Sequence, residues 1–290
     1  MNILPTDSTL GATVDGVDLK VLDDESINEI LRAWNKFAVL VFPEQHLDDE
    51  THISFSRIFG GLERLLTTSI ADEHPEVCRV SNVRLDGSID QPGGSYELHQ
   101  LGNQYWHTDS SFKNTPSKAS ILRAQTVPAT GGDTQFADMR SAYDALGTED
   151  KARLETKVVV HDYIYSQGLI GGLEQLSNEE LSALPPVEHR LIQTHPESGR
   201  RSLFVGRHAS HLLGEDLESS RGELAAITEE ACQPPRVFTH KWHDGDVVVW
   251  DNRCVLHRGR PWDQDQPRVM FRTTVAGDGY SNDWLVSENR

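Results

Sequence analysis

The stretch Asp246-Val-Val-Val-Trp250-Asp-Asn-Arg-Cys-Val-Leu-His257-Arg carries the clearest structural pattern in this 290-residue chain. Its apolar run predicts a buried strand, and the polar residues that follow predict a turn that places His257 just beyond the strand. Comparable strand-like runs recur, at 38–42, 76–80, 157–161, 202–206, 236–240 and 269–275. Many short strands separated by turns favour a sandwich or jelly roll.

A few helices interrupt these strands. Apolar residues at helical spacing predict helices over 24–36 and 49–59, the second ending at Gly60-Gly61, and further helices near 141–154 and 219–231. The glycine-rich stretch 84–104 is typical of a loop, and residues 65–105 are expected to form part of a lid. We therefore expect one mainly β domain with flanking helices over residues 1–290.

The composition limits the classes of partner. Acidic residues outnumber basic ones by 45 to 27, giving a net charge of −18. This charge argues against a nucleic-acid or anionic-membrane partner. The three cysteines, Cys78, Cys232 and Cys254, lie too far apart for a zinc knuckle or a disulfide frame, which favours the cytoplasm. Neither a signal peptide nor a membrane-spanning run is expected, and a homo-oligomer stays open.

Potential metal ligands occur in Asn103-Gln-Tyr-Trp-His107-Thr-Asp109-Ser-Ser-Phe112. If this segment is extended, His107 and Asp109 point to the same face. The pattern His-x-Asp is weak by itself: it recurs at His46-Leu-Asp48, where the acidic residues are typical of a helix start. A hydrogen-bonded His–Asp pair on a surface strand is the simple alternative.

His257 strengthens the metal hypothesis. Two imidazoles and one carboxylate form the ligand set of non-haem Fe(II) oxygenases, which leaves metal positions open for substrate and oxygen. The same three ligands would also suit a zinc hydrolase or a metal-binding jelly roll without catalytic activity.

Two arginines follow: Arg268 lies just before the strand predicted at 269–275, and Arg272 lies within it. Arg268 and Arg272 are four residues apart, so their side chains share one face of a strand. Guanidinium groups bind carboxylates through two parallel hydrogen bonds. The pair would suit one carboxylate of a co-substrate and one of a substrate, although either residue alone could simply form a surface ion pair.

These motifs together resemble a known family. The resemblance rests on Trp106-His107-Thr-Asp109-Ser-Ser-Phe112, Gly131-Gly-Asp-Thr134-Gln-Phe-Ala-Asp-Met139, Trp250-Asp-Asn-Arg-Cys-Val-Leu-His257-Arg-Gly and Arg268. The chain resembles the taurine dioxygenase (TauD/TfdA) family of Fe(II)/2-oxoglutarate-dependent dioxygenases. Within that family it is most similar to the aryloxyalkanoate dioxygenases, which act on dichlorophenoxyacetate and phenoxypropionate. The fold that this resemblance implies is a double-stranded β-helix, a cupin-like jelly roll with the metal ligands at its open end.

The resemblance also implies roles for single residues. His107, Asp109 and His257 would bind Fe(II), and Thr134 with Arg268 would hold the distal carboxylate of 2-oxoglutarate. Arg272 would bind the anionic group of the substrate. Asn103 would contact the oxoacid or support a metal ligand.

The implied reaction consumes O₂ and 2-oxoglutarate and forms succinate and CO₂. The implied substrate is a small aromatic anion, an aryloxyalkanoate that is cleaved to a phenol and a 2-oxoacid. A sulfonate, a sulfate ester or another natural carboxylate is the alternative. Five aromatic residues near the motifs favour an aryl group, or else belong to the core: Tyr96, Tyr105, Phe112, Trp262 and Phe271.

Overall fold

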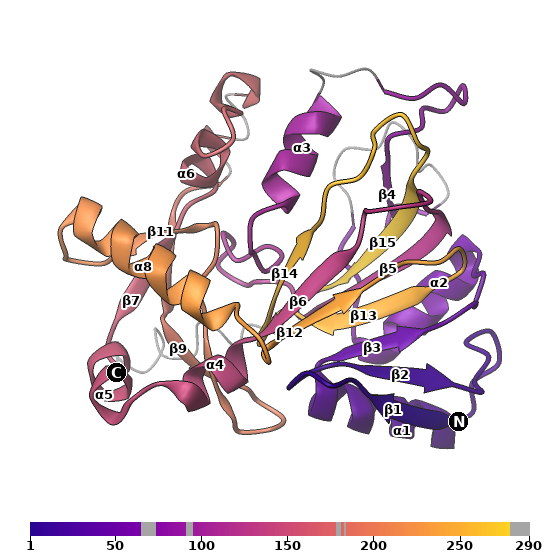
Figure 1. Cartoon of the computed structure of the whole chain (residues 1–290), viewed down its shortest axis with the longest axis horizontal. Coiled ribbons are helices and arrows are strands. Elements are labelled where there is room, and N and C mark those ends of the chain that lie inside the picture. The colour runs from indigo at the N-terminus through magenta and orange to yellow at the C-terminus, as the bar shows by residue number, and fades with distance from the viewer. Residues whose placement is uncertain (65–73, 91–94, 178–180, 183, 279–290) are drawn as a thin grey trace.

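The computed structural model describes residues 1–64, 74–90, 95–177, 181–182 and 184–278. Its centre is a seven-stranded sheet in the order β1-β2-β3-β13-β5-β15-β4 (Figure 1). The strands are β1 (Asn2–Pro5), β2 (Ala12–Asp15), β3 (Val39–Phe42), β13 (Val247–Asp251), β5 (Ala119–Thr126), β15 (Val269–Val275) and β4 (Cys78–Ser81). All neighbours are antiparallel except β2 and β3.

A smaller sheet packs against this one. It consists of β12 (Val237–His240), β6 (Thr134–Asp138) and β14 (Val255–Gly259), in that order. Residues of both sheets share one apolar cluster, in which Trp250 and Leu122 of the large sheet meet Phe136 and Val255 of the small one. The two sheets thus form the mainly β sandwich that the sequence predicts.

The other face of the large sheet is covered by helices. The helix α1 (Asp24–Phe37) and the segment formed by α2 (Asp49–Ser56) and η1 (Arg57–Phe59) pack on a second apolar cluster. Leu40 and Phe42 belong to this cluster, whereas Val39 and Val41 face the sandwich interior. These four residues form β3, which is apolar on both faces because both faces are covered.

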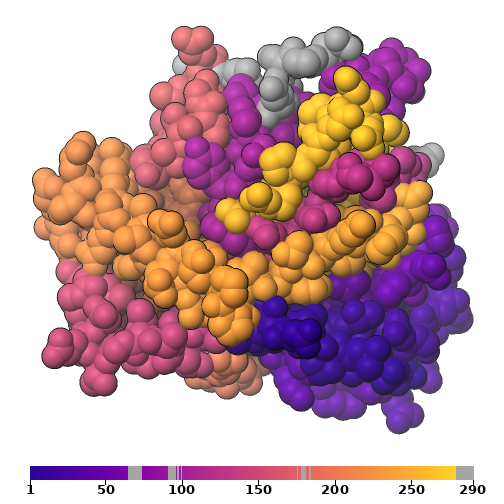
Figure 2. Space-filling model, viewed as in Figure 1, coloured from indigo at the N-terminus to yellow at the C-terminus, as the bar shows by residue number. Residues whose placement is uncertain are grey.

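A third layer lies on the outer face of the small sheet. It contains β7 (Val158–His161), β8 (Val187–Arg190), β9 (Ile192–Thr194), β10 (Arg201–Leu203) and β11 (Ala209–Leu212), with helices α4 (Met139–Ala145), α5 (Thr148–Leu154), α6 (Tyr163–Gly168), η2 (Leu173–Gln175) and α8 (Leu217–Ala231). Ala137 and Leu256 of the small sheet join its apolar cluster. In the space-filling view, the orange segment that contains α8 extends from the left side to the centre, where it meets the indigo N-terminal segment (Figure 2). No helix in the described ranges is long and apolar enough to cross a membrane.

Several sequence predictions are corrected. The loop expected over 84–104 contains the helix α3 (Ser95–Asn103), and the single helix expected near 141–154 is two helices. Leu146 is extended, with ψ 144°, and α5 begins after Gly147. The segment around His107 is not a strand: His107 forms an isolated bridge with His257, and Asp109 already lies in a turn.

Other local predictions are confirmed. Asp48 is the N-cap of α2 and accepts a hydrogen bond from the Thr51 N–H, so His46-Leu-Asp48 is a helix start. Gly60 ends η1 with φ 145°. The predicted lid at about 65–105 includes residues 65–73 and 91–94, which lie outside the described part of the chain.

Candidate metal centre

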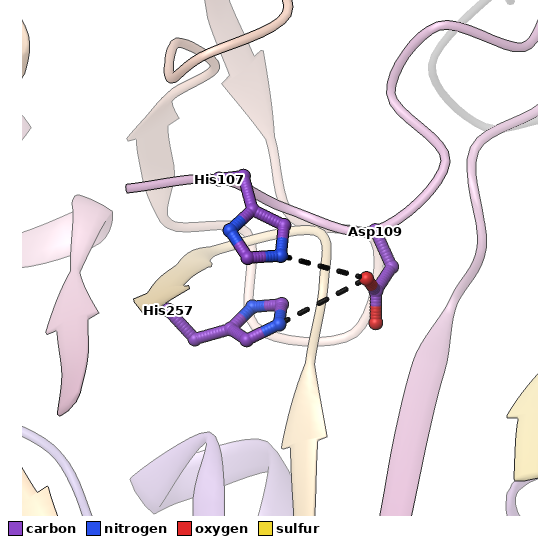
Figure 3. A group of neighbouring side chains, drawn as sticks. All are labelled: His107, Asp109 and His257. Atoms are coloured by element: carbon purple, nitrogen blue, oxygen red, sulfur yellow. Dashed lines mark ion pairs between the residues drawn. The ribbon is translucent and has the colours of Figure 1, made fainter. Parts of the chain in front are cut away.

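Three side chains from two separate parts of the chain meet in the interior of the sandwich (Figure 3). His107 and His257 are joined by their backbones, with N–O distances of 3.0 and 2.8 Å between the two residues. Their rings therefore lie side by side, 4.2 Å apart between centroids. The turn after His107 brings Asp109 in front of both rings.

The spacing of the donor atoms suits one divalent ion. Asp109 Oδ1 lies 3.9 Å from His107 Nε2 and 3.8 Å from His257 Nε2. One donor atom of each residue lies within 4.8 Å of the others, and all three side chains are buried. Ligand bonds of about 2.1 Å to a shared ion give donor separations of roughly 3–4 Å. The geometry fits a facial 2-His-1-carboxylate centre.

The ring orientation of His107 is set by the backbone. Its Nδ1 lies 2.8 Å from the carbonyl oxygen of Tyr105, so this nitrogen donates and Nε2 keeps its lone pair for the centre. Such a bond from the remote imidazole nitrogen is a common feature of metal-binding histidines.

The carboxylate is oriented by side chains. Ser120 Oγ donates a 2.6 Å hydrogen bond to Asp109 Oδ2, which leaves Oδ1 facing the imidazoles. Asn252 Nδ2 in turn donates to Ser120 Oγ at 3.0 Å, and Asn252 Oδ1 accepts from the Trp250 indole N–H at 3.0 Å. Ser120 and Asn252 were not predicted from the sequence, because a lone serine in a strand and a lone asparagine in a turn carry no pattern.

The protonation states favour metal binding. Burial lowers the pKa of His107 and of His257, and in His107 the neighbouring His257 adds to this effect. Burial alone would raise the pKa of Asp109, but the Arg272 guanidinium and the two imidazoles outweigh it and hold that pKa below its usual value. Neutral imidazoles and an ionised carboxylate are the forms that bind a metal.

A small cavity of about 60 Å³ adjoins the three side chains. It brings together most of the residues that the sequence singled out: Asn103, His107, Thr134, His257, Trp262, Arg268 and Arg272 line it. Residues as far apart in the chain as Asn103 and Arg272 thus line one pocket.

Arg268 is a buried cation in this pocket. Its side chain has no acidic partner within the described ranges, its Nε has no hydrogen-bond partner, and its guanidinium lies 5.0 Å from the Trp262 ring. Burial lowers the pKa of Arg268, which reflects the cost of an uncompensated charge. An anion bound here would remove that cost.

Thr134 lies across the pocket and accepts a 2.9 Å hydrogen bond from the Trp242 indole N–H. The preceding Gly131 and Gly132 have φ of 76° and 72°. A Cβ on Gly131 would lie 2.6 Å from the Pro261 carbonyl oxygen, so the turn requires glycine. The predicted tight turn before Thr134 is confirmed.

Arg272 lines the same pocket and contacts the carboxylate of Asp109. Its Nη1 lies 3.5 Å from Asp109 Oδ1, and its side chain keeps 29% of its surface exposed. The residue therefore borders both the carboxylate ligand and open space.

The five aromatic residues divide into two groups. Trp262 lines the pocket, and Phe112 packs against Tyr163 and His208, with ring centroids 4.7 and 4.9 Å apart. Like Phe112, the other three are not among the residues that line the pocket: Phe271 packs under Arg123, Tyr105 is exposed, and Tyr96 is part-buried in α3. The sequence did not identify Tyr163 and His208.

His195, Asp251 and Cys254 form a second buried group with metal-ligand chemistry. Here Asp251 already accepts hydrogen bonds from Arg253 at 2.7 and 2.9 Å and from His195 Nε2 at 2.9 Å. Burial raises the pKa of the Cys254 thiol. A carboxylate saturated by a guanidinium beside a protonated thiol is a structural network rather than a metal site.

A family model described as "Taurine catabolism dioxygenase TauD, TfdA family" matches residues 2–274. The chain belongs to the TauD/TfdA family. Members of this dioxygenase family use Fe(II), 2-oxoglutarate and O₂, and this TauD/TfdA protein is an Fe(II)- and 2-oxoglutarate-dependent dioxygenase with the jelly-roll fold.

Individual relatives agree with the family. The (S)-phenoxypropionate/alpha-ketoglutarate-dioxygenase of Sphingobium herbicidovorans is 42% identical, over 98% of both chains. The alpha-ketoglutarate-dependent 2,4-dichlorophenoxyacetate dioxygenase of Cupriavidus pinatubonensis is 39% identical, over 94% of this TauD/TfdA chain and 97% of its own. A crystal structure of AAD-2 in complex with Mn(II) and N-oxalylglycine superimposes with a TM-score of 0.89 at 40% identity, covering 97% of this chain and all of the other.

Proposed function

We propose that residues 1–290 form one domain that hydroxylates an aryloxyalkanoate, a small aromatic anion, and releases a phenol and a 2-oxoacid. His107, Asp109 and His257 bind the iron. Thr134 and Arg268 hold the distal carboxylate of 2-oxoglutarate, Asn103 contacts the oxoacid or supports a ligand, and Arg272 binds the carboxylate of the substrate. Relatives named for phenoxypropionate and dichlorophenoxyacetate support this choice of substrate.

The observation that carries the proposal is the pair of arginines beside the three ligands. Arg268 is buried without an acidic partner within the described ranges, and Arg272 is the one guanidinium that reaches the ligand carboxylate there. Two cations at one centre suit two separate carboxylates. This is the requirement of a reaction between 2-oxoglutarate and an anionic substrate.

The residues of the chain position the reactants. When bound, Fe(II) would activate O₂, which is the oxidant, and 2-oxoglutarate would supply two electrons as it is converted to succinate and CO₂. Arg272 fixes the substrate carboxylate, so that the carbon between carboxylate and ether oxygen faces the centre. Phe112, three residues after Asp109, packs at a tilt on Tyr163, with 4.7 Å between the ring centroids, and this aromatic pair would contact the aryl group. A hydroxyl group on that carbon makes a hemiacetal or hemiketal, which separates into phenol and 2-oxoacid.

A substrate panel tests the proposal. The Fe(II)-loaded enzyme with ascorbate and 2-oxoglutarate is given phenoxyacetate, each enantiomer of 2-phenoxypropionate, or taurine, and succinate and phenol are measured together. We expect equimolar succinate and phenol with at least one phenoxyalkanoate. Succinate formation that only taurine stimulates, or turnover with zinc and no 2-oxoglutarate, would contradict the proposal.

We further propose the cytoplasm as the compartment, supported by the three cysteines, all of which are free thiols.

A further inference from the structure

A second and larger cavity, of about 1050 Å³, lies outside the metal centre. We call it the α8 groove. It is bounded by α8, by the ends of α3 and α6, and by the outer face of the small sheet, next to which α8 runs in Figure 1. It shares no lining residue with the pocket beside the metal centre.

The groove and the metal centre use opposite faces of the same strands. In β6, Thr134 lines the metal pocket and Gln135 lines the groove; in β14, His257 lines the pocket and Arg258 the groove. Alternate residues of a strand point to opposite faces, so this division follows from the pleat. Trp106 lines the groove immediately before the ligand His107.

The groove collects positive charge in an acidic protein. Three arginines line it, Arg207, Arg221 and Arg258, against one acidic residue, the exposed Glu229. Within the described ranges none of the three forms an ion pair, whereas nearby Arg153 pairs with Glu223 and Arg236 with Glu230. For a chain with a net charge of −18, three uncompensated guanidinium groups in one cavity require an explanation.

The guanidinium groups are held in place by flat contacts. Arg258 lies over the Trp106 ring at 4.4 Å, and Arg221 lies over the Tyr165 ring at 4.7 Å. Stacking of this kind uses the face of the guanidinium and leaves its edge N–H groups available to donate. In Arg258 one of them, on Nε, already donates a 2.8 Å hydrogen bond to Gln135 Oε1.

Arg207 packs so closely on α3 that a Cβ on Gly102 would lie 2.0 Å from its Nη1. The Nε atoms of Arg207 and Arg221 are buried and have no hydrogen-bond partner among the described residues. Burial lowers the pKa of Arg207 and of Arg258, and a bound anion would oppose that shift.

The rest of the wall combines apolar and uncharged polar side chains. Leucine, alanine and valine side chains form its apolar part: Leu101, Leu169, Ala209, Leu224, Ala225 and Val237. Glutamine and threonine side chains add hydrogen-bonding groups: Gln104, Gln135, Thr228, Gln233 and Thr239. A cavity of this size with apolar surface and convergent polar groups is typical of a small-molecule site.

We propose that the α8 groove binds a small amphipathic carboxylate, with its carboxylate on the arginine edges and its apolar body against α8. Charge decides this choice of occupant. A neutral ligand would leave three half-buried cations without a counter-charge, and a nucleic acid would meet the repulsion of the net negative charge outside the groove. The site is separate from the catalytic pocket and does not depend on the substrate proposed above.

Equilibrium binding tests this site. The protein is loaded with Mn(II) and N-oxalylglycine, so that no turnover occurs, and (4-fluorophenoxy)acetate is titrated with ¹⁹F NMR detection. We expect two saturable sites per chain. Arg221→Gln should weaken one of them at least tenfold, and Ala225→Trp, which fills the groove from an exposed position on α8, should abolish the same one.

Matched variants separate the outcomes. Arg32→Gln makes the same charge change on the exposed face of α1 and should leave both sites intact. Arg272→Ala should remove only the catalytic site; if that site is absent from the wild type while the Arg221-dependent one remains, the proposed substrate fails and the groove stands. Binding that neither Arg221→Gln nor Ala225→Trp alters would overturn the groove proposal. The proposal would also be overturned if Arg221→Gln or Ala225→Trp changed the oligomeric state in sedimentation and left probe binding unaltered. The groove would then be an interface between copies of the chain.

Discussion

Replacing Ser120 by alanine tests whether the carboxylate ligand depends on the residues behind it. The change removes the 2.6 Å hydrogen bond to Asp109 Oδ2 and leaves the buried Asn252 Nδ2 without its acceptor. A hydrogen bond to a charged group contributes about 1.5–3 kcal/mol, and loss of a residue that orients a metal ligand costs about 10–100-fold in metal affinity. We therefore expect Ser120→Ala to raise the Kd for Mn(II) by about 10–100-fold.

The assay is an anaerobic calorimetric titration of the 2-oxoglutarate-bound protein with Mn(II). Ser117→Ala is the matched control, since Ser117 is also fully buried and donates a 2.8 Å hydrogen bond to a carboxylate, that of Glu63, away from the centre. Both variants should lose stability, by about 1–3 kcal/mol in urea unfolding. Equal Mn(II) affinities in the two variants would refute the reasoning, because the serine would then act on the fold alone.

Two further predictions concern the arginines and the pH dependence of stability. Arg268→Ala should raise the KM for 2-oxoglutarate by about 10–100-fold and the KM for the substrate far less, and Arg272→Ala should do the reverse. Steady-state kinetics with each reactant varied in turn measures both constants. Equal changes in the two KM values would contradict these roles. His52 is fully buried, and burial, with help from Arg123, lowers its pKa to about 3. A histidine whose pKa is depressed in the folded state contributes stability that is complete above about pH 6.5 and is lost as the pH falls towards 3. Between pH 7 and 4.5 the wild type should therefore lose about 2–3 kcal/mol more unfolding free energy than His52→Gln, measured by urea unfolding, and parallel losses in the two proteins would count against this explanation.

The sequence predicted the features that rest on local patterns. The strand β13 was predictable because its apolar run is covered on both faces, and the three ligands because their residue types are rare in combination. The helix α3 was missed because its Gly102 is unfavourable in a helix; the helix packs at this glycine against the side chain of Arg207, which is more than a hundred residues away. Such a tertiary contact cannot be read from neighbouring residues.

The three ligands of the centre differ in what sets their positions. His107 and His257 are bonded to each other through their backbones, so the separation of the imidazoles is set by the pairing of two chain segments. Asp109 lies in a turn, and its position depends on Ser120 and Asn252, and on Arg272 at 3.5 Å. Backbone pairing is insensitive to side-chain replacement, whereas the carboxylate depends on a chain of side-chain hydrogen bonds. Substitutions around Asp109 should therefore change metal affinity and substrate orientation together, because Arg272, the proposed substrate anchor, contacts the same carboxylate.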